Sequence, residues 1–311
     1  MIVLDWRGAA RDTVAAVFER ERGRWLETLQ WDPARALREV EHARTTWGLP
    51  GLIALDEQGN PLGSIFYLPD SKRFDIGGVT ADTPAVTAAL LDTVVARARA
   101  ESIGEVRCFV FDSAPNLGNE LHARGFSVEK FEYLTATLGP SGVQGGGRKP
   151  DGGARLETNA WRAADLAGTA MLLQDAYDRE SARVFAPQGT REEWERYLRN
   201  LIEHGACGDL NVQASRVLRS AGQVLAAAVV TVVAPRTAHL AQFAVHPAVQ
   251  RQGVARAVLE EVWQTTARQG FERATLLVAE GNTRARALYA SLGFHPAAAF
   301  LAAHRVLPAV A

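Results

Sequence analysis

One stretch near the middle of the chain, GPSGVQGGGRKPDGG at residues 139–153, constrains the fold more than any other. It has almost no apolar side chains and is dominated by glycine, with two prolines. Such a segment cannot bury enough apolar surface to offset the entropy lost on ordering it. We therefore predict a linker over 139–153 that joins two domains, 1–138 and 154–311, each of ordinary domain size.

Hydrophobic periodicity predicts the same order of elements in both halves: a strand, a helical region, several strands, an amphipathic helix, a buried strand and a short helix. In the second half, the amphipathic helix is expected at 253–268, the buried strand is ATLLVA, and the short helix is expected at 283–291. A final strand at 299–306 is expected to complete that domain. In the first half, the last three are a helix capped by Thr83, the strand VRCFVF and the segment NELHARGF. The sequence thus predicts a tandem repeat of one α/β (α+β) fold.

Composition excludes several classes of function. Lys and Arg total 34 against 35 Asp and Glu, a net charge of -1, so neither a nucleic acid nor a membrane surface is expected as a partner. The two cysteines, Cys108 and Cys207, form no metal-binding pattern, so no metal is expected. No apolar run approaches the roughly 18 residues of a membrane span. The sequence predicts a cytoplasmic protein and leaves its oligomeric state open.

The segment QRQGVARAVLEEV, which begins at Gln250, places a glycine where a helix starts. A helix N-terminus has unpaired N–H groups and about half a positive charge, so it attracts phosphate groups. Gly253 allows close approach of the backbone, Ala255 keeps the next turn small, and Arg251 adds positive charge at the rim. The loop therefore predicts a binding site for a diphosphate.

Two motifs frame this loop. The first motif consists of V-x-P, which starts at Val245, and Q-x-x-G-x-A, which starts at Gln250. The second motif, N-x-x-A-x-x-L-Y-x-x-x-G-F, starts at Asn282. With these motifs the second half resembles the GNAT superfamily of acetyl-CoA-dependent N-acetyltransferases, and the tandem arrangement is similar to the mycothiol synthase type. The resemblance implies two tandem GNAT domains. Each would be a mixed, mostly antiparallel sheet, flanked by helices and splayed near the V-x-P strand.

The resemblance also implies that acetyl-CoA is the co-substrate. The residues expected to contact it belong to the V-x-P strand, the loop and the second motif: Phe243, Val245, Gln250, Arg251, Gln252, Gly253, Val254, Ala255, Arg256, Asn282, Arg284, Ala285 and Tyr289. Tyr289 matches the family tyrosine that serves as general acid to the thiolate. Structural alternatives exist: Tyr289 as a half-buried helix aromatic, Asn282 as a helix cap, and Arg284 as a solvated surface charge.

The sequence offers two candidates for the catalytic base. The strand position where many family members have a glutamate, six before the valine, holds His239. Strict alternation would place His239 on one face with Phe243 and Val245, and Gln242 on the opposite face. His239 and Glu280 are both candidate bases, although His239 at a strand edge and Glu280 in solvent are the structural alternatives.

The first half lacks the loop motif. Asp82 would bring negative charge towards a phosphate, and His122 stands in place of the tyrosine, so we interpret this half as a degenerate repeat without cofactor. The predicted function is transfer of an acetyl group to a primary amine of a small molecule or peptide in a ternary complex, with residues 174–189 lining the acceptor site. The alternative is a non-catalytic acetyl-CoA-binding sensor or scaffold.

Overall fold

The computed structural model describes residues 1–144, 157–203 and 207–308, which form two compact units. The first unit comprises Met1–Glu132 together with Ala298–Ala311, and the second comprises Tyr133–Ala297. These units differ from the predicted domains, which were expected to part at 139–153. Of that predicted linker, residues 139–144 include the end of one strand and the short strand β7 (Gly142–Val143), and residues 145–153 lie outside the described residues.

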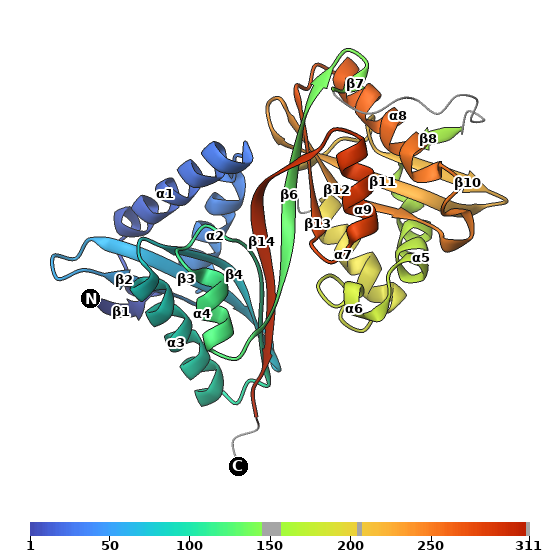
Figure 1. Cartoon of the computed structure of the whole chain (residues 1–311). Helices are drawn as coiled ribbons and strands as arrows, with labels where there is room; N and C mark the ends of the chain where they lie inside the picture. The colour runs from blue at the N-terminus through green and yellow to red at the C-terminus, as the bar shows by residue number, and fades with distance from the viewer. Residues whose placement is uncertain (145–156, 204–206, 309–311) are drawn as a thin grey trace. The chain divides into compact units, whose positions relative to one another are not determined.

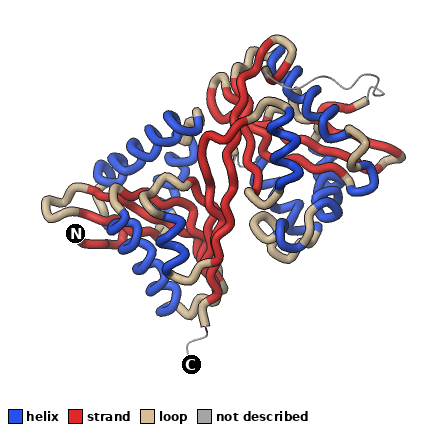
Figure 2. Tube along the Cα trace, viewed as in Figure 1, coloured by secondary structure: helices blue, strands red, loops and turns tan. Residues whose placement is uncertain are grey.

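The first unit is a mostly antiparallel sheet with helices on both faces (Figures 1 and 2). Its strands follow the order β1 (Ile2–Asp5), β2 (Gly51–Leu55), β3 (Pro61–Pro69), β4 (Arg73–Ala81), β5 (Glu105–Phe111) and β14 (His295–Val306). Its helices are α1 (Arg11–Leu29), α2 (Ala34–Thr46), α3 (Pro84–Ala100) and α4 (Leu117–Ala123), with a 3-10 turn, η1 (Trp6–Gly8). Alternation along β2 divides the core: Leu52 and Ala54 join the cluster that contains α3, whereas Ile53 packs with Trp6 and α1.

The second unit repeats this order with its own strands. They are β6 (Ser127–Gly139), β13 (Arg273–Ala279), β12 (Thr237–Val245), β11 (Gln223–Ala234), β10 (Arg216–Ser220) and β8 (Thr158–Ala160), and β7 and β9 (Asp209–Leu210) pair with β6 and β11. The helices are α5 (Leu166–Ala176), α6 (Arg179–Ala182), α7 (Arg191–Glu203), α8 (Val254–Arg268) and α9 (Thr283–Ser291), with 3-10 turns η2 (Ala163–Asp165) and η3 (Pro247–Val249). α8 buries Val258, Leu259, Val262 and Trp263 as its apolar period predicts. The fold class predicted from the sequence is confirmed.

Each unit completes its sheet with a strand from the other half of the chain. In the first unit, β14 pairs antiparallel with β5, from Phe300 opposite Phe111 to Val306 opposite Glu105. In the second unit, residues 133–139 of β6 lie beside β13, and the Leu138 N–H donates to the Glu272 carbonyl at 2.8 Å. The strand expected to complete the second domain therefore belongs to the first, because an apolar alternating strand does not encode which sheet edge it joins.

Candidate functional site

The parallel strands β12 and β13 of the second unit separate partway along their length. Their parallel pairing runs from Thr237 opposite Arg273 to Leu240 opposite Leu276, and both strands then continue without partnering each other. At this point β12 contains a β-bulge: Leu240 pairs with Val230 and Gln242 with Val229, which leaves Ala241 as the extra residue. A bulge bends and twists its strand. The splay expected near the V-x-P strand is thus present, and the bulge lies where it begins.

The bulge also changes which residues share a face. Ala238 and Leu240 pack in the cluster under α8 and α9, and so do Phe243 and Val245 after the bulge. His239 therefore faces the opposite side, the same side as Gln242, whose carboxamide accepts from the Tyr177 hydroxyl at the end of α5. The prediction that His239 shares a face with Phe243 and Val245 is wrong, whereas Gln242 does lie opposite those two residues. Strict alternation does not hold across an inserted residue.

Polar main-chain groups of β12 are turned into the splay. The His246 N–H donates to the Leu225 carbonyl of β11 at 2.8 Å, so by alternation the groups of Phe243 and Val245 point away from β11, towards β13. In this structure the Val245 carbonyl accepts from Gln250 Nε2 at 2.9 Å, and the Phe243 N–H donates to Gln242 Oε1 at 2.9 Å. The other two groups of this edge, the Phe243 carbonyl and the Val245 N–H, are those with which an extended ligand entering the splay would pair.

The loop before α8 has the geometry of an anion site. Arg251 and Gly253 both have left-handed backbone conformations, with φ of 63° and 80°, and an added Cβ at Gly253 would meet nothing within 4 Å. Gly253 is the N-cap of α8, and no side chain caps that helix. By contrast, the Asn282 side chain caps α9 by accepting from the Ala285 N–H at 3.1 Å. The first N–H groups of α8 are thus the ones left for a ligand.

The arginines predicted to hold the cofactor have different surroundings. Arg284 Nη1 donates to Gln250 Oε1 at 2.9 Å, which brings the start of α9 to the loop. Arg251 is exposed at the rim, together with Gln252. Arg256 instead donates a hydrogen bond to the Ser291 hydroxyl, and its Nη1 lies 3.6 Å from Glu260 Oε1. Its positive charge is therefore partly neutralised by a neighbouring carboxylate. Val254 is buried under the loop. The structure therefore brings Gln250 and Arg284 together, whereas Arg256 interacts with Ser291 and Glu260.

Tyr289 is buried on α9 beside Phe294, with ring centroids 6.1 Å apart. Burial raises the pKa of its phenol far above the usual value, and the nearby Tyr177 phenol raises that pKa further. Tyr289 is therefore protonated at neutral pH, as a proton donor must be.

The two candidate bases lie in contrasting environments. His239 is only 2 % exposed, its ring stacks on Tyr133, and its Nδ1 lies 3.0 Å from Thr275 Oγ1. Burial lowers the pKa of His239 to about 3, so the ring is neutral and a weak base at pH 7, which disfavours the role expected from the sequence. Glu280 follows β13 in the exposed turn before α9, and its main-chain carbonyl accepts from Arg286.

Sequence reasoning missed Tyr177 and Gln242 as a pair, because the bulge that places them together has no signature in the residue pattern. Two carboxylates of the expected acceptor segment, residues 174–189, have partners within the second unit. Asp178 caps α6 through the Ser181 N–H at 2.8 Å, and Asp175 lies 3.7 Å from the ring of His246. Both carboxylates therefore already interact with groups of the protein itself.

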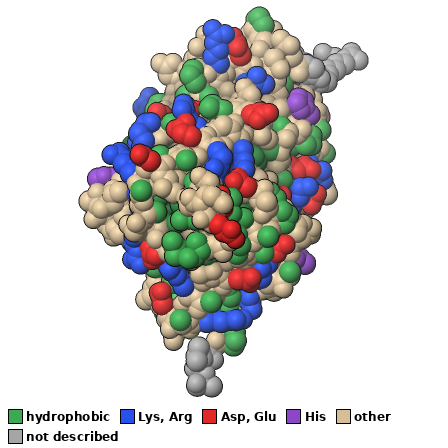
Figure 3. Space-filling model, turned by 90° about the vertical axis from the view of Figure 1, so that its left-hand side faces the viewer, with side chains coloured by type: hydrophobic (Ala, Val, Ile, Leu, Met, Phe, Trp, Pro, Cys, Tyr) green, Lys and Arg blue, Asp and Glu red, His purple; other side chains and the backbone are tan. Residues whose placement is uncertain are grey.

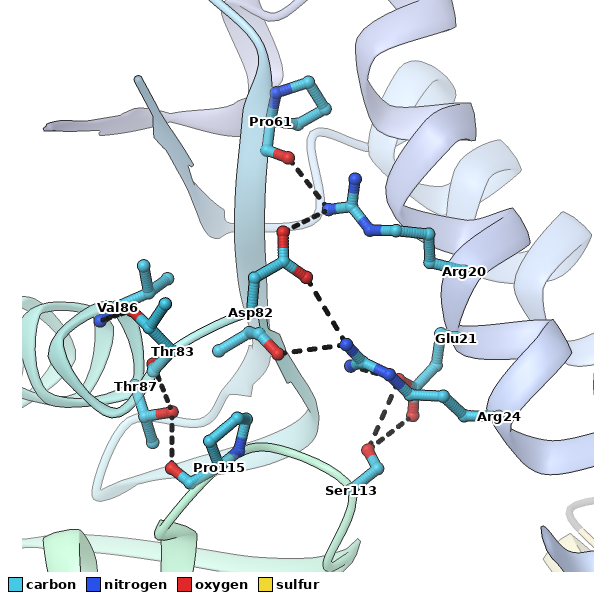
Figure 4. Close-up of polar contacts among 11 residues, drawn as sticks. Arg20, Glu21, Arg24, Pro61, Asp82, Thr83, Val86, Thr87, Ser113 and Pro115 are labelled. Carbon is cyan, nitrogen blue, oxygen red and sulfur yellow. Dashed lines mark hydrogen bonds and ion pairs between the residues drawn. The ribbon is translucent and has the colours of Figure 1, made fainter. Parts of the chain in front are cut away.

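The first unit has the same strand geometry, but arginine side chains of α1 contact the end of its strand β4 (Figure 4). Its parallel β4–β5 pairing also ends at a bulge, with Gly77 as the extra residue, so Ala81 corresponds to Val245. Arg24 Nη2 donates to the Ala81 carbonyl at 3.2 Å and to Asp82 at 3.3 Å, and Arg20 also pairs with Asp82, at 3.5 Å.

The helix that follows β4 in the first unit, α3, has a side-chain cap. Thr83 caps α3 by accepting from the Val86 N–H, and Pro84 occupies the first turn, which removes one N–H donor. Together with Asp82, these features distinguish the start of α3 from the uncapped start of α8.

Comparison with known proteins identifies a family domain in the second half of the chain. Residues 173–294 match the model of the acetyltransferase (GNAT) family, so the second half of the chain contains a GNAT acetyltransferase domain. Domains of this family transfer an acyl group from acetyl-CoA. No curated protein matches the chain.

Several solved structures resemble the whole chain in fold. A GCN5-related N-acetyltransferase from Sphaerobacter thermophilus has a TM-score of 0.67 at 14% identity and covers 99% of this chain and 97% of its own. A tandem GNAT protein from the clavulanic acid biosynthesis pathway has a TM-score of 0.56 at 15% identity, covering 84% of each chain. An acetyltransferase from Colwellia psychrerythraea has a TM-score of 0.54 at 14% identity, covering 98% of this chain and 99% of its own. The tandem arrangement therefore occurs in known structures.

Three further observations concern metals, membranes and surface charge. Within residues 1–144, 157–203 and 207–308, no group of three or more His, Cys, Asp or Glu side chains is arranged to hold a metal ion. In the same part of the chain, no helix has the length and apolar character needed to cross a bilayer. On the face drawn in Figure 3, Lys and Arg side chains are interspersed with Asp and Glu.

Proposed function

We propose that the protein is an N-acetyltransferase that binds one acetyl-CoA in its second unit. The diphosphate would lie on the uncapped start of α8, and the pantetheine arm would pair with the edge of β12 in the splay. The observation that most supports this is the combination of the two: an open helix N-terminus directly after a bulged strand whose Phe243 and Val245 groups face the gap.

The proposed reaction is direct attack within a ternary complex. The amine nitrogen forms a bond to the thioester carbon, and the carbonyl π electrons move to oxygen. The C–S bond breaks when the oxyanion collapses, and the thiolate leaves. Tyr289, protonated because it is buried, would supply the proton that the thiolate needs.

The amine must lose a proton, and we assign the role of base to Glu280 rather than to His239. Its side chain is in the exposed turn after β13, whereas His239 is enclosed and has a pKa of about 3. The acceptor would be a primary amine of a small molecule or peptide. It would enter beside Tyr177 and Phe185, whose rings pack with Trp194 between α5 and α7.

A second candidate function is a sensor or scaffold that binds acetyl-CoA without turnover. It is favoured by one observation: the strand position that often holds a catalytic glutamate holds a buried, neutral histidine instead. In this alternative, acetyl-CoA would bind at the same site as in the enzyme, but no acetyl group would be transferred.

Calorimetric titration of acetyl-CoA into the whole chain, followed by a thiol-release assay with glucosamine, spermidine and a dipeptide as amine probes, tests both candidates. We expect one site per chain and release of coenzyme A thiol above the amine-free rate. Binding without release for any probe would favour the sensor. Absence of binding would overturn both functions.

A further inference from the structure

The oxygen and the nitrogen of the Gln242 carboxamide differ in their hydrogen bonding. Its Oε1 accepts twice, from the Tyr177 hydroxyl at 3.0 Å and from the Phe243 N–H at 2.9 Å. Its Nε2 is buried and has no hydrogen-bond partner among the described residues. The whole residue is only 6 % exposed. Buried donors are nearly always paired, so this nitrogen needs an explanation.

The orientation of this carboxamide follows from chemistry. A main-chain N–H can only donate, so the atom that faces the Phe243 N–H at 2.9 Å must be the oxygen. The other end is therefore the NH₂ group, which has two hydrogens to donate. Exchanging the two ends would set two donors against each other and would still leave an unpaired atom.

The location of this donor follows from the strand geometry. The Phe243 N–H points from β12 into the splay, so Gln242 Oε1, which accepts from it, lies at the edge of the gap. Gln242 already occupies the N–H that a ligand oxygen would otherwise use. The amide nitrogen bonded to the same carbon is then the donor that remains for a ligand in the splay.

We propose that Gln242 Nε2 donates a hydrogen bond to the carbonyl oxygen of the bound acyl thioester, which makes Gln242 a catalytic residue; this rests on the proposed function. When the amine attacks, the π electron pair moves onto this oxygen, and the donor stabilises it until the pair returns and the C–S bond breaks. Gln242 neither gains nor loses a proton. The amine proton goes to the base, and the thiolate receives its proton from Tyr289.

Tyr177 acts through Gln242 as a positioning residue. Its hydroxyl and the Phe243 N–H both donate to Oε1, and hydrogen bonds that follow one another in this way polarise the amide and strengthen its N–H as a donor. Burial raises the pKa of Tyr177 to about 12, so its hydroxyl keeps the proton that it donates at any pH suitable for assay.

A binding experiment isolates the proposed contact. Acetyl-CoA and S-ethyl-CoA differ at the acyl group by the carbonyl oxygen, and their dissociation constants are measured calorimetrically for the wild type and for Gln242→Met. We expect the wild type to prefer acetyl-CoA and the variant to lose about 3- to 10-fold of that preference, the value of one hydrogen bond. An unchanged preference overturns this inference alone. If neither probe binds the wild type, the proposed function fails and the inference fails with it.

A kinetic experiment separates a donor from a merely structural residue. In Gln242→Glu the introduced carboxyl can donate only when protonated, so transfer relative to the wild type should rise as pH falls. The assay uses the amine probe that the wild type turns over fastest. Gln264→Glu, near the far end of α8, is the matched control and should show no such rise. A pH profile shared by both variants, or Gln242→Glu at wild-type rate at pH 8, would overturn the proposal.

Discussion

A charge placed at the start of α8 gives the sharpest test of the cofactor loop, because the same helix offers a matched control. Gly253 precedes α8 and Gly270 follows it, with φ of 80° and 85°, and an added Cβ at either would meet nothing within 4 Å. Replacing either glycine by glutamate costs about 1–2 kcal/mol of backbone strain. We therefore expect Gly253→Glu and Gly270→Glu to lower the melting temperature by similar amounts.

Their effects on acetyl-CoA binding should differ greatly. Two like unit charges 4 Å apart near a protein surface repel by about 4 kcal/mol. A glutamate at position 253 can turn partly away from the diphosphate and salt screens it, so we take half of this, about 2 kcal/mol, which is about 30-fold in Kd. Gly270 lies at the other end of a helix about 22 Å long, well beyond the screening length.

The assay is calorimetric titration of acetyl-CoA into the wild type and both variants, at low and at high salt. The loss in Gly253→Glu should shrink as salt rises, because it is electrostatic. Equal affinities for the two variants, with similar melting temperatures, would refute the placement of the diphosphate at α8.

Three further predictions address acid catalysis, pH dependence and packing. Tyr289→Phe should lower kcat roughly 100-fold and leave acetyl-CoA affinity unchanged; an unaltered kcat would exclude Tyr289 as the acid. His239 has a pKa of about 3, below its unfolded value of 6.5, so its neutral burial favours folding above pH 6.5 and this advantage is lost as pH falls towards 3. Urea unfolding at pH 7 and pH 5 should therefore show the wild type losing about 2 kcal/mol more than His239→Gln, and equal losses would contradict the buried state. Arg44 is buried, pairs with Glu41 and donates to the Trp6 carbonyl, so Arg44→Ala should destabilise folding by about 3 kcal/mol, whereas the exposed control Arg35→Ala should cost under about 0.5 kcal/mol; similar costs would argue against the buried pair.

Much of the local structure could be predicted from the residues themselves. Thr83 caps α3, Asn282 caps α9, and α8 spans nearly the range that its apolar period indicates. These features depend on neighbours within one or two turns, so a short window of sequence contains the information.

The errors arose where distant segments meet. The bulge at Ala241 puts His239 and Phe243 on opposite faces instead of the same face, and a bulge depends on pairing with β11 rather than on β12 alone. The low pKa of His239 depends on burial against Tyr133, which lies 106 positions earlier in the chain. A window of sequence holds neither fact.

The exchanged strands have a practical consequence. A fragment that begins at residue 154, the boundary expected from the linker, would lack residues 133–139 and would leave the edge of β13 unpaired in the second unit. Experiments on this protein therefore need the whole chain.

The sequence by itself determined the repeated order of the later elements, the boundaries of α8 and α9, and the glycine loop, because periodicity and capping are short-range properties of a chain. Only the tertiary structure decided which strand completes each sheet, which face Gln242 occupies and which histidine stays neutral. These outcomes depend on backbone pairing and desolvation between residues that are close in space but far apart in sequence, and the pattern of one strand does not specify its partner.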